Sequence, residues 1–222
     1  MSSNTPTAEA QAGGGAQYSL TFVNNSSQNG AACVFQRDPN LGVPNAMPLA
    51  WFARWAGPST RVNFQWTTDY SFVWGQVGQL VPGVTFMSAQ MWPADLSTRN
   101  MVTFSTAGGN IGFQNPTQGP SPGSLYINEA PTVFPNMAAV GIGMSGSATF
   151  VAQAMPNMML VFTPHPQYWI AFGNFEQGQV LDPYQITNAA QIAFPPGVYS
   201  VTATLNQDNT WTIQPNNGVN EQ

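Results

Sequence analysis

The stretch YSVTATLNQDNTWTI, residues 199–213, decides the fold class, because apolar and polar side chains alternate on both sides of a polar turn. Strict alternation is the period of a half-buried β-strand, and residues 206–209 are all turn formers. The apolar positions of the first run are Tyr199, Val201, Ala203 and Leu205. We predict a β-hairpin here.

Two earlier pairs of runs repeat this pattern. Residues 18–22 alternate, and a polar stretch at 24–29 leads to a second apolar run at 33–36, which predicts a hairpin-like pair. Aromatic residues alternate along 62–66 and again along 70–74, which predicts two aromatic ladders that face one another.

Further short apolar runs follow at intervals of about ten residues, the spacing typical of β-sandwiches. They lie at 101–105, 124–128, 140–143, 148–152, 159–163, 169–172 and 191–194. The chain has 19 prolines and 21 glycines, which leave little room for helices; residues 49–55 are the best candidate for a short helix or an irregular segment.

These runs together predict an all-β fold, a single antiparallel β-sandwich of about ten or more short strands over residues 17–215. A chain of 222 residues is within the size range of one such domain. Residues 1–16 lack large apolar side chains and contain three consecutive glycines, so we expect a flexible N-terminal arm. Residues 216–222 form a polar C-terminal tail.

Charged residues are scarce: they make up 6% of the chain, against about a quarter in ordinary soluble proteins. There are four arginines, nine carboxylates and no lysine, for a net charge of −5, while 20 Asn and 19 Gln carry much of the polarity. Nucleic acids and anionic membranes are recognised by clustered cations. The composition therefore argues against both as partners and predicts a nearly neutral surface.

The N-terminus has no basic and apolar signal sequence, and no stretch is long enough to span a bilayer. We expect cytoplasmic synthesis, with any export by a non-Sec route. The single cysteine, Cys33, cannot form an internal disulfide, and its apolar run predicts a small buried side chain on a strand.

Catalytic and metal-binding patterns are weak, so we expect no enzyme, no cofactor and no metal site. The one histidine, His165, lies between two prolines and is interpreted as a loop residue without a catalytic role. The nine acids are scattered singly: Glu9, Asp38, Asp69, Asp95, Glu129, Glu176, Asp182, Asp208 and Glu221. Folding can still bring two of them across a cleft, which keeps a glycoside hydrolase open as an alternative.

Two other patterns have structural interpretations. Residues 141–146 match G-x-G-x-x-G, but no helix and no acid about twenty positions later follow, so we interpret these glycines as sheet-crossing or turn residues. The loops at 24–29 and 206–209 contain too few carboxylates for a calcium site.

Aromatic and amide side chains remain as the means of binding. Aromatic rings stack on sugar faces and amides bond hydroxyls, so a lectin-like carbohydrate-binding site is one alternative. Trp92, Trp51 and Trp55 lie outside clear alternation and are the candidate ligand contacts, although a tryptophan is more often a core residue. Neutral strand edges without lysine also favour a homo-oligomer or a larger homo-assembly.

Three blocks of the chain, YSLTFVNNSS at 18–27, CVFQRDP at 33–39 and FQWTTDYSFVW at 64–74, resemble the RhiA-type rhizosphere-expressed proteins of rhizobia and related bacteria. The resemblance covers most of residues 18–215. It implies an abundant bacterial protein made under cell-density control near plant roots and linked to plant–microbe interaction, without established catalytic residues. The sequence thus predicts a non-enzymatic, neutral-surfaced interaction or self-assembling protein.

Overall fold

The computed structural model describes residues 16–38, 40–182 and 186–216. The predicted arm at 1–16 and tail at 216–222 fall almost wholly outside these ranges. Within them the chain forms seventeen strands and one short 3₁₀ turn, Ala107–Gly109, which confirms the all-β prediction. No helix in the described ranges is both long enough and apolar enough to cross a membrane.

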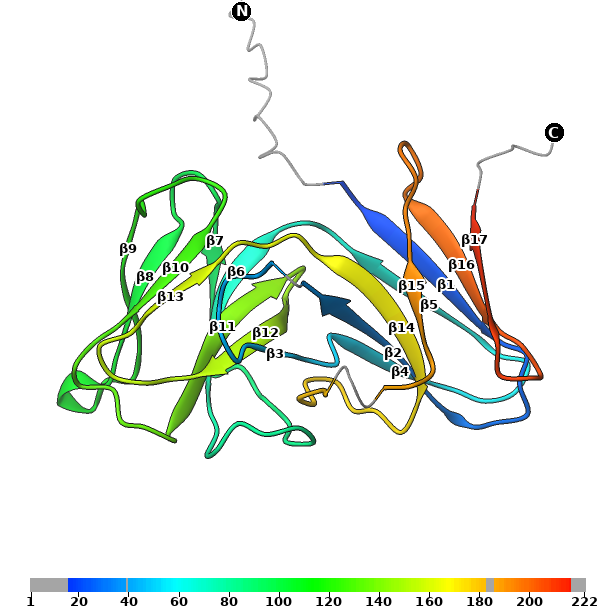
Figure 1. The fold of residues 1–222 in the computed structure, drawn as a ribbon, viewed down its shortest axis with the longest axis horizontal. Helices are drawn as coiled ribbons and strands as arrows, with labels where there is room; N and C mark the ends of the chain where they lie inside the picture. The colour runs from blue at the N-terminus through cyan, green and yellow to red at the C-terminus, as the bar shows by residue number, and fades with distance from the viewer. Residues whose placement is uncertain (1–15, 39, 183–185, 217–222) are drawn as a thin grey trace, which may run out of the picture.

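The strands form four sheets (Figure 1). Sheet I has the order β17 (Trp211–Pro215), β16 (Ser200–Leu205), β1 (Tyr18–Asn24), β5 (Arg61–Trp66). Sheet II has the order β15 (Ala189–Ile192), β14 (Gln167–Gly173), β2 (Gly30–Arg37), β4 (Phe52–Ala56). Sheet III has the order β3 (Met47–Pro48), β12 (Ser147–Gln153), β11 (Ala138–Met144), β6 (Tyr70–Gln76), β7 (Gln90–Ala94). Sheet IV has the order β13 (Met159–Phe162), β10 (Leu125–Glu129), β8 (Met101–Ser105), β9 (Gly112–Thr117).

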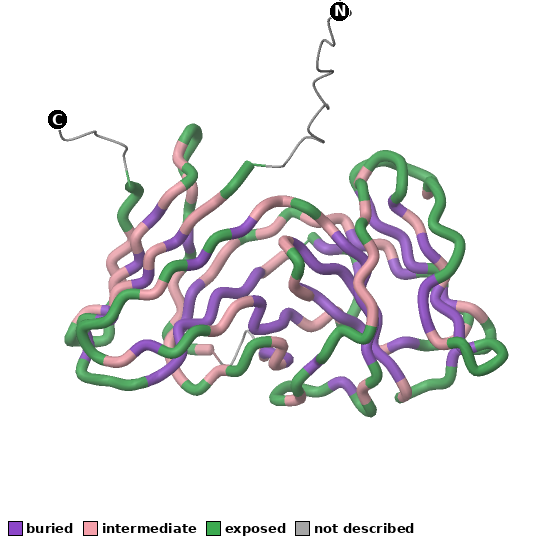
Figure 2. The backbone as a smooth tube through the Cα atoms, turned by 180° about the vertical axis from the view of Figure 1, so that it is seen from behind, coloured by how far each residue is buried: buried purple, intermediate pink, exposed green. Residues whose placement is uncertain are grey.

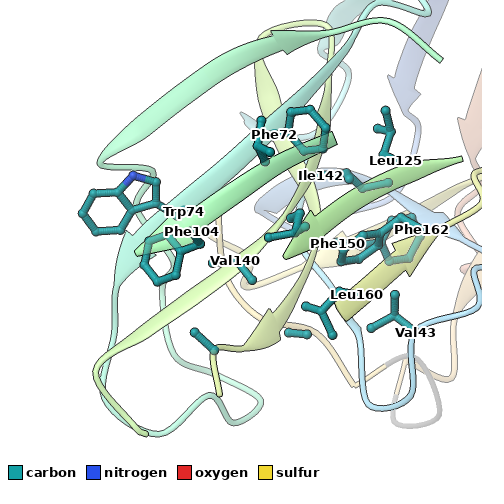
Figure 3. Packing of buried hydrophobic residues seen from close by; sticks show 14 of the residues in the cluster. Val43, Phe72, Trp74, Phe104, Leu125, Val140, Ile142, Phe150, Leu160 and Phe162 are labelled. Atoms are coloured by element: carbon teal, nitrogen blue, oxygen red, sulfur yellow. The ribbon is translucent and has the colours of Figure 1, made fainter. Parts of the chain in front are cut away.

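The sheets pack in two pairs, each around its own apolar core. Sheets I and II enclose a cluster that includes Phe22, Trp51 and Trp66. Sheets III and IV enclose a second cluster that includes Phe72 and Phe104 (Figure 3). The two pairs lie side by side along the long axis of the molecule (Figure 1). The sandwich packing expected from the sequence is therefore present twice, with four sheets in place of two.

The hairpin at 199–213 is confirmed, because β16 and β17 pair antiparallel with Leu205 opposite Trp211. The hairpin-like pair at 18–36 is wrong: β1 pairs with β16 and β5 in sheet I, whereas β2 pairs with β14 and β4 in sheet II. The connection turns the chain from one sheet to the other. The buried Asn24 amide holds that turn by donating to the carbonyls of Gln28 and Ala56, at 2.9 Å and 3.3 Å.

The facing aromatic ladders are also wrong, since β5 belongs to sheet I and β6 to sheet III. A polar link replaces the expected pairing: the Ser145 hydroxyl accepts from the Thr67 amide at 3.1 Å, and the Ser145 amide donates to the Asp69 carbonyl at 2.9 Å. Residues 49–55 contain no helix, because residues 52–55 belong to β4, which is hydrogen-bonded to β2.

Two loops cover the outer faces of sheets II and III and join the sheet pairs. They are residues 77–89, between β6 and β7, and residues 174–182, after β14. Leu80 and Phe86 pack on sheet III, and Leu181 packs on sheet II. The loops are hydrogen-bonded to each other, for example from the Val180 amide to the Val84 carbonyl at 2.7 Å. Strands β2 and β11 are consequently buried almost throughout, as the purple segments near the middle of the molecule show (Figure 2).

Cys33 lies in the small apolar cluster between sheet II and the loop that contains Leu181. Its side chain is fully buried on β2, and burial raises the pKa of the thiol well above its ordinary value. A thiol that stays protonated is a poor nucleophile and metal ligand. The structure thus confirms the prediction of a small buried side chain on a strand.

Candidate binding pocket at the seam of the two sheet pairs

A pocket of about 600 Å³ lies where sheet II meets sheet III. We call it the seam pocket; its polar lining consists of Arg37, Asp38, Asn45, Gln167, Trp169 and Asp182. Strands β2 and β14 contribute from one side, and β3 and β12 from the other. Its volume is typical of sites that hold a small molecule.

Arg37 and Trp169 form the best-defined feature of the seam pocket. The guanidinium lies over the Trp169 ring at 4.1 Å from the ring centroid, and at 5.5 Å from that of Phe35. Stacking on aromatic faces orients the planar fork of an arginine and lowers its conformational freedom. The Trp169 Nε1 is buried and has no hydrogen-bond partner among the described residues. A buried donor without a partner is uncommon in folded proteins.

Asp38 holds one margin of the pocket together. Its Oδ1 accepts from the Asn40 amide at 3.1 Å, and its Oδ2 accepts from the His165 amide. The carboxylate therefore ties the loop after β2 to the segment before β14. Such a group is committed to structure, which disfavours it as the mobile proton donor of a hydrolase.

His165 is exposed and does not line the seam pocket. Its Nδ1 lies 3.0 Å from the Thr163 carbonyl oxygen, so the ring packs on its own loop. This contact fits the interpretation of His165 as a loop residue.

The opposite wall of the seam pocket is apolar, and its backbone groups are already paired. Leu41, Val43 and Phe150 contribute apolar side chains. The Leu181 amide donates to the Pro48 carbonyl at 2.9 Å, and the Leu41 carbonyl accepts from the Thr163 amide at 2.8 Å. Recognition in this pocket therefore depends on side chains: one guanidinium, two carboxylates and two carboxamides beside an apolar surface.

None of the three tryptophans predicted as ligand contacts lines the seam pocket. Trp51 is fully buried and its Nε1 donates to the Met144 carbonyl at 3.0 Å, so it is a core residue out of reach of a ligand. Trp55, on the edge strand β4, is 66% exposed, whereas Trp92, on β7, is half-buried against the core of sheets III and IV. The structure does not bring the three into one site.

The sequence pointed to Trp92, Trp51 and Trp55 and missed Trp169. Trp169 lies in a run that predicts a strand, and a strand tryptophan is normally expected in the core. The available signal was Arg37, which directly follows the apolar run at 33–36. A cation in that position is unusual in a chain with only four arginines.

Glu129 is a buried carboxyl group outside the seam pocket. It is 1% exposed at the end of β10; its Oε1 accepts from the Met155 amide at 3.3 Å, and its Oε2 has no hydrogen-bond partner among the described residues. Burial raises the pKa of Glu129 to about 7. The pKa rises because burial disfavours the charged form, with no second carboxylate among its causes.

Acidic side chains in polar turns accept hydrogen bonds from groups of the same turn. Asp208 Oδ1 accepts from the Thr210 amide at 3.1 Å and from the Thr210 hydroxyl at 2.6 Å, and these bonds lower the pKa of Asp208. Among the described residues, no three His, Cys, Asp or Glu side chains come close enough to hold a metal ion.

Comparison with known proteins shows the family of the chain. The family model RhiA matches residues 15–216. The chain belongs to the RhiA family. It is 42% identical over 204 residues to Protein RhiA of Rhizobium leguminosarum bv. viciae, which covers 90% of this chain and 87% of that relative. No solved structure matches it. The resemblance stated from the three sequence blocks is confirmed.

Proposed function

We propose that the protein is a non-enzymatic binding protein whose seam pocket takes a neutral, hydroxyl-rich ligand, a sugar residue of a glycan. The observation that carries this proposal is the stack of Arg37 on Trp169 beside the carboxamides of Asn45 and Gln167 in one pocket. Hydroxyl groups both donate and accept, so they pair with carboxylate, carboxamide and guanidinium groups alike. The apolar wall suits the C–H face of a sugar ring.

The polar groups of the pocket support binding without turnover. A glycoside hydrolase needs two carboxyl groups that face each other across the scissile bond, one of them free to donate a proton. Two carboxylates, Asp38 and Asp182, line the seam pocket, but Asp38 is held by two backbone amides, and Glu129, whose pKa is raised, does not line the pocket. We therefore prefer a lectin-like role over hydrolysis.

Family membership supports the biological setting. The relative named above comes from Rhizobium, and its name is that of the family. We infer a role in the rhizosphere, in which the protein recognises a plant or microbial glycan. A pocket that reads hydroxyl groups suits such a target better than nucleic acid, which is recognised through clusters of cations.

We expect Asn45→Gly to weaken binding of the preferred neutral glycan by about tenfold, the effect of one lost hydrogen bond to a ligand. Asn45 has φ 60°, which glycine adopts readily, so the change removes the amide and spares the backbone. A neutral-glycan array identifies the ligand, and calorimetric titration measures its affinity.

Asn157→Gly is the matched control, because Asn157 also has φ 60° and is exposed outside the pocket. It should bind as the unaltered protein does. Equal affinities of the two variants would place the glycan elsewhere.

Self-association is a second candidate function, favoured by an uncharged apolar region. Residues 130–175 contain no Asp, Glu, Lys or Arg. Four exposed large apolar side chains belong to this segment: Phe134, Met155, Met158 and Met159. The absence of charge removes repulsion between copies, and exposed methionines form adaptable contacts.

Six of the eight edge strands oppose ladder pairing between copies, whereas β13 and β15 carry neither proline nor charge. Proline interrupts four edge strands, at Pro48, Pro93, Pro116 and Pro215. Two further edge strands, β4 and β5, carry arginines. Proline and charge on an edge both oppose strand addition. Copies are therefore expected to meet mainly through the exposed apolar side chains of residues 130–175, which are Phe134, Met155, Met158 and Met159.

We expect the mass measured by light scattering to rise with protein concentration, and the double variant Met158→Gln/Met159→Gln to stay monomeric under the same conditions. Replacing the exposed thioethers by amides removes apolar contact area. Met87→Gln, at a side chain that is 76% exposed outside the segment, is the control. A protein that remains monomeric at high concentration would end this candidate.

A further inference from the structure

A second pocket, of about 450 Å³, shares a wall with the seam pocket. We call it the loop pocket; its polar lining consists of Gln179, Asp182, Thr187 and Asn188. Three residues line both pockets: Pro82, Leu181 and Asp182. The two pockets are therefore neighbours on the side of the molecule where the loops cover sheets II and III.

The side chains of the loop pocket resemble those of the seam pocket in chemistry. Thr187 is exposed, and its hydroxyl can donate and accept. Asn188 is held in place by the C-terminal hairpin: its Oδ1 accepts from Trp211 Nε1 at 2.9 Å and its Nδ2 donates to the Asn209 carbonyl at 3.1 Å. Phe172 and Phe175 supply aromatic surface. Neutral polar groups next to aromatic rings again suit a sugar ring.

The backbone of residues 178–181, which leads into the shared wall, offers no open strand edge to a ligand. The Gly178 amide donates to the Ala50 carbonyl at 2.8 Å, and the Gly178 carbonyl accepts from Phe86 at 2.9 Å. The Val180 carbonyl accepts from Gly83 at 2.9 Å. The segment thus bonds to neighbours on both sides, like an inserted strand. An extended peptide binds mainly through an open strand edge, so this segment favours a ligand that is recognised by side chains.

We propose that the loop pocket and the seam pocket are adjoining subsites for one linear neutral oligosaccharide, with Pro82, Leu181 and Asp182 lining both subsites. This inference rests on the proposed function of the seam pocket and names its ligand as a chain in place of a single sugar. Occupying the second subsite adds contacts without a second loss of translational freedom, so affinity rises with chain length.

The test is a titration of the full chain with cellobiose and cellotetraose, two neutral linear glucans of different length, and with the di- and tetrasaccharide of the best array ligand. We expect the tetrasaccharide to bind at least about tenfold more tightly than the disaccharide. Thr187→Val should weaken tetrasaccharide binding about threefold to tenfold and leave disaccharide binding unchanged. Thr117→Val, at an exposed threonine on β9 outside both pockets, is the matched control.

Two failures are distinguishable. If no neutral saccharide of either length binds, the proposed function of the seam pocket is overturned, and the subsites with it. If both lengths bind equally tightly, or if Thr187→Val weakens both equally, only the adjoining subsites are overturned. Binding of an extended neutral peptide in place of the tetrasaccharide would also overturn them.

Discussion

Gly141→Ala is expected to lower the free energy of unfolding by at least about 3 kcal/mol. A Cβ at this position would lie 2.0 Å from the Phe150 carbonyl oxygen and 2.7 Å from the Val151 Cα. Both atoms belong to the backbone of β12, and β11 is held on its other side by β6. A backbone contact cannot be relieved by a side-chain rotation, so the sheet must distort.

Gly78→Ala is the matched control, since a Cβ there would meet nothing within 4 Å. It should change stability by no more than about 0.5 kcal/mol. Urea denaturation, followed by tryptophan fluorescence, measures both variants. Similar midpoints for the two variants would contradict the close approach of β11 and β12.

This close approach explains the glycine pattern at 141–146. Gly141 and Gly143 lie in β11, where a Cβ would strike the neighbouring strands, and Gly146 has φ 75° in the turn that follows. The prediction that these glycines serve the sheet and a turn is confirmed. A short motif of this kind is informative only together with the strand and helix that normally flank it.

Glu129→Gln is expected to stabilise the protein at pH 8 by about 3 kcal/mol and to leave its stability at pH 4 unchanged. The pKa of Glu129 is raised from its ordinary value of 4.5 to about 7 in the folded protein. Between these two values the unfolded chain loses the proton while the folded protein retains it. Stability is therefore full below about pH 4.5, falls as the pH rises to about 7, and is constant above that.

Thermal or urea denaturation over pH 4 to 8 measures this effect. In the variant the amide cannot ionise, so the part of the pH dependence that belongs to Glu129 disappears. Glu176→Gln, which removes an exposed carboxyl group, is the control and should keep the original slope. A Glu129→Gln profile parallel to that of the unaltered protein would show that the buried carboxyl does not titrate in this range.

The sequence was sufficient for most of the strands, although it missed β3, β4, β7 and β9, and it was insufficient for their partners. Alternation revealed the hairpin of β16 and β17, because its two strands are joined by a short turn. It did not reveal that β1 lies parallel to β16, since the two strands are separated by most of the chain. Alternation shows which face of a strand is apolar. It does not show whether β1 and β2 lie side by side in one sheet or in two sheets that face each other across a core, because both arrangements bury the apolar faces.

The candidate binding site was harder to predict than the fold for the same reason. Arg37 and Trp169 become neighbours only because β2 pairs with β14 over a distance of more than a hundred residues. The tryptophans that looked irregular in sequence have other uses, and Trp51 in particular is a core residue. The composition predicted part of the chemistry: both pockets contain carboxamides and aromatic rings, but the seam pocket also brings together three charged residues, Arg37, Asp38 and Asp182.

The most direct test of the account is a crystal structure of the protein with the neutral glycan that binds most tightly on the array. We predict a sugar ring in the seam pocket, in contact with Asn45 and Gln167 and with the Arg37–Trp169 stack, and the glycosidic bonds intact. A glycan bound outside both pockets, or cleaved in the crystal, would contradict the account.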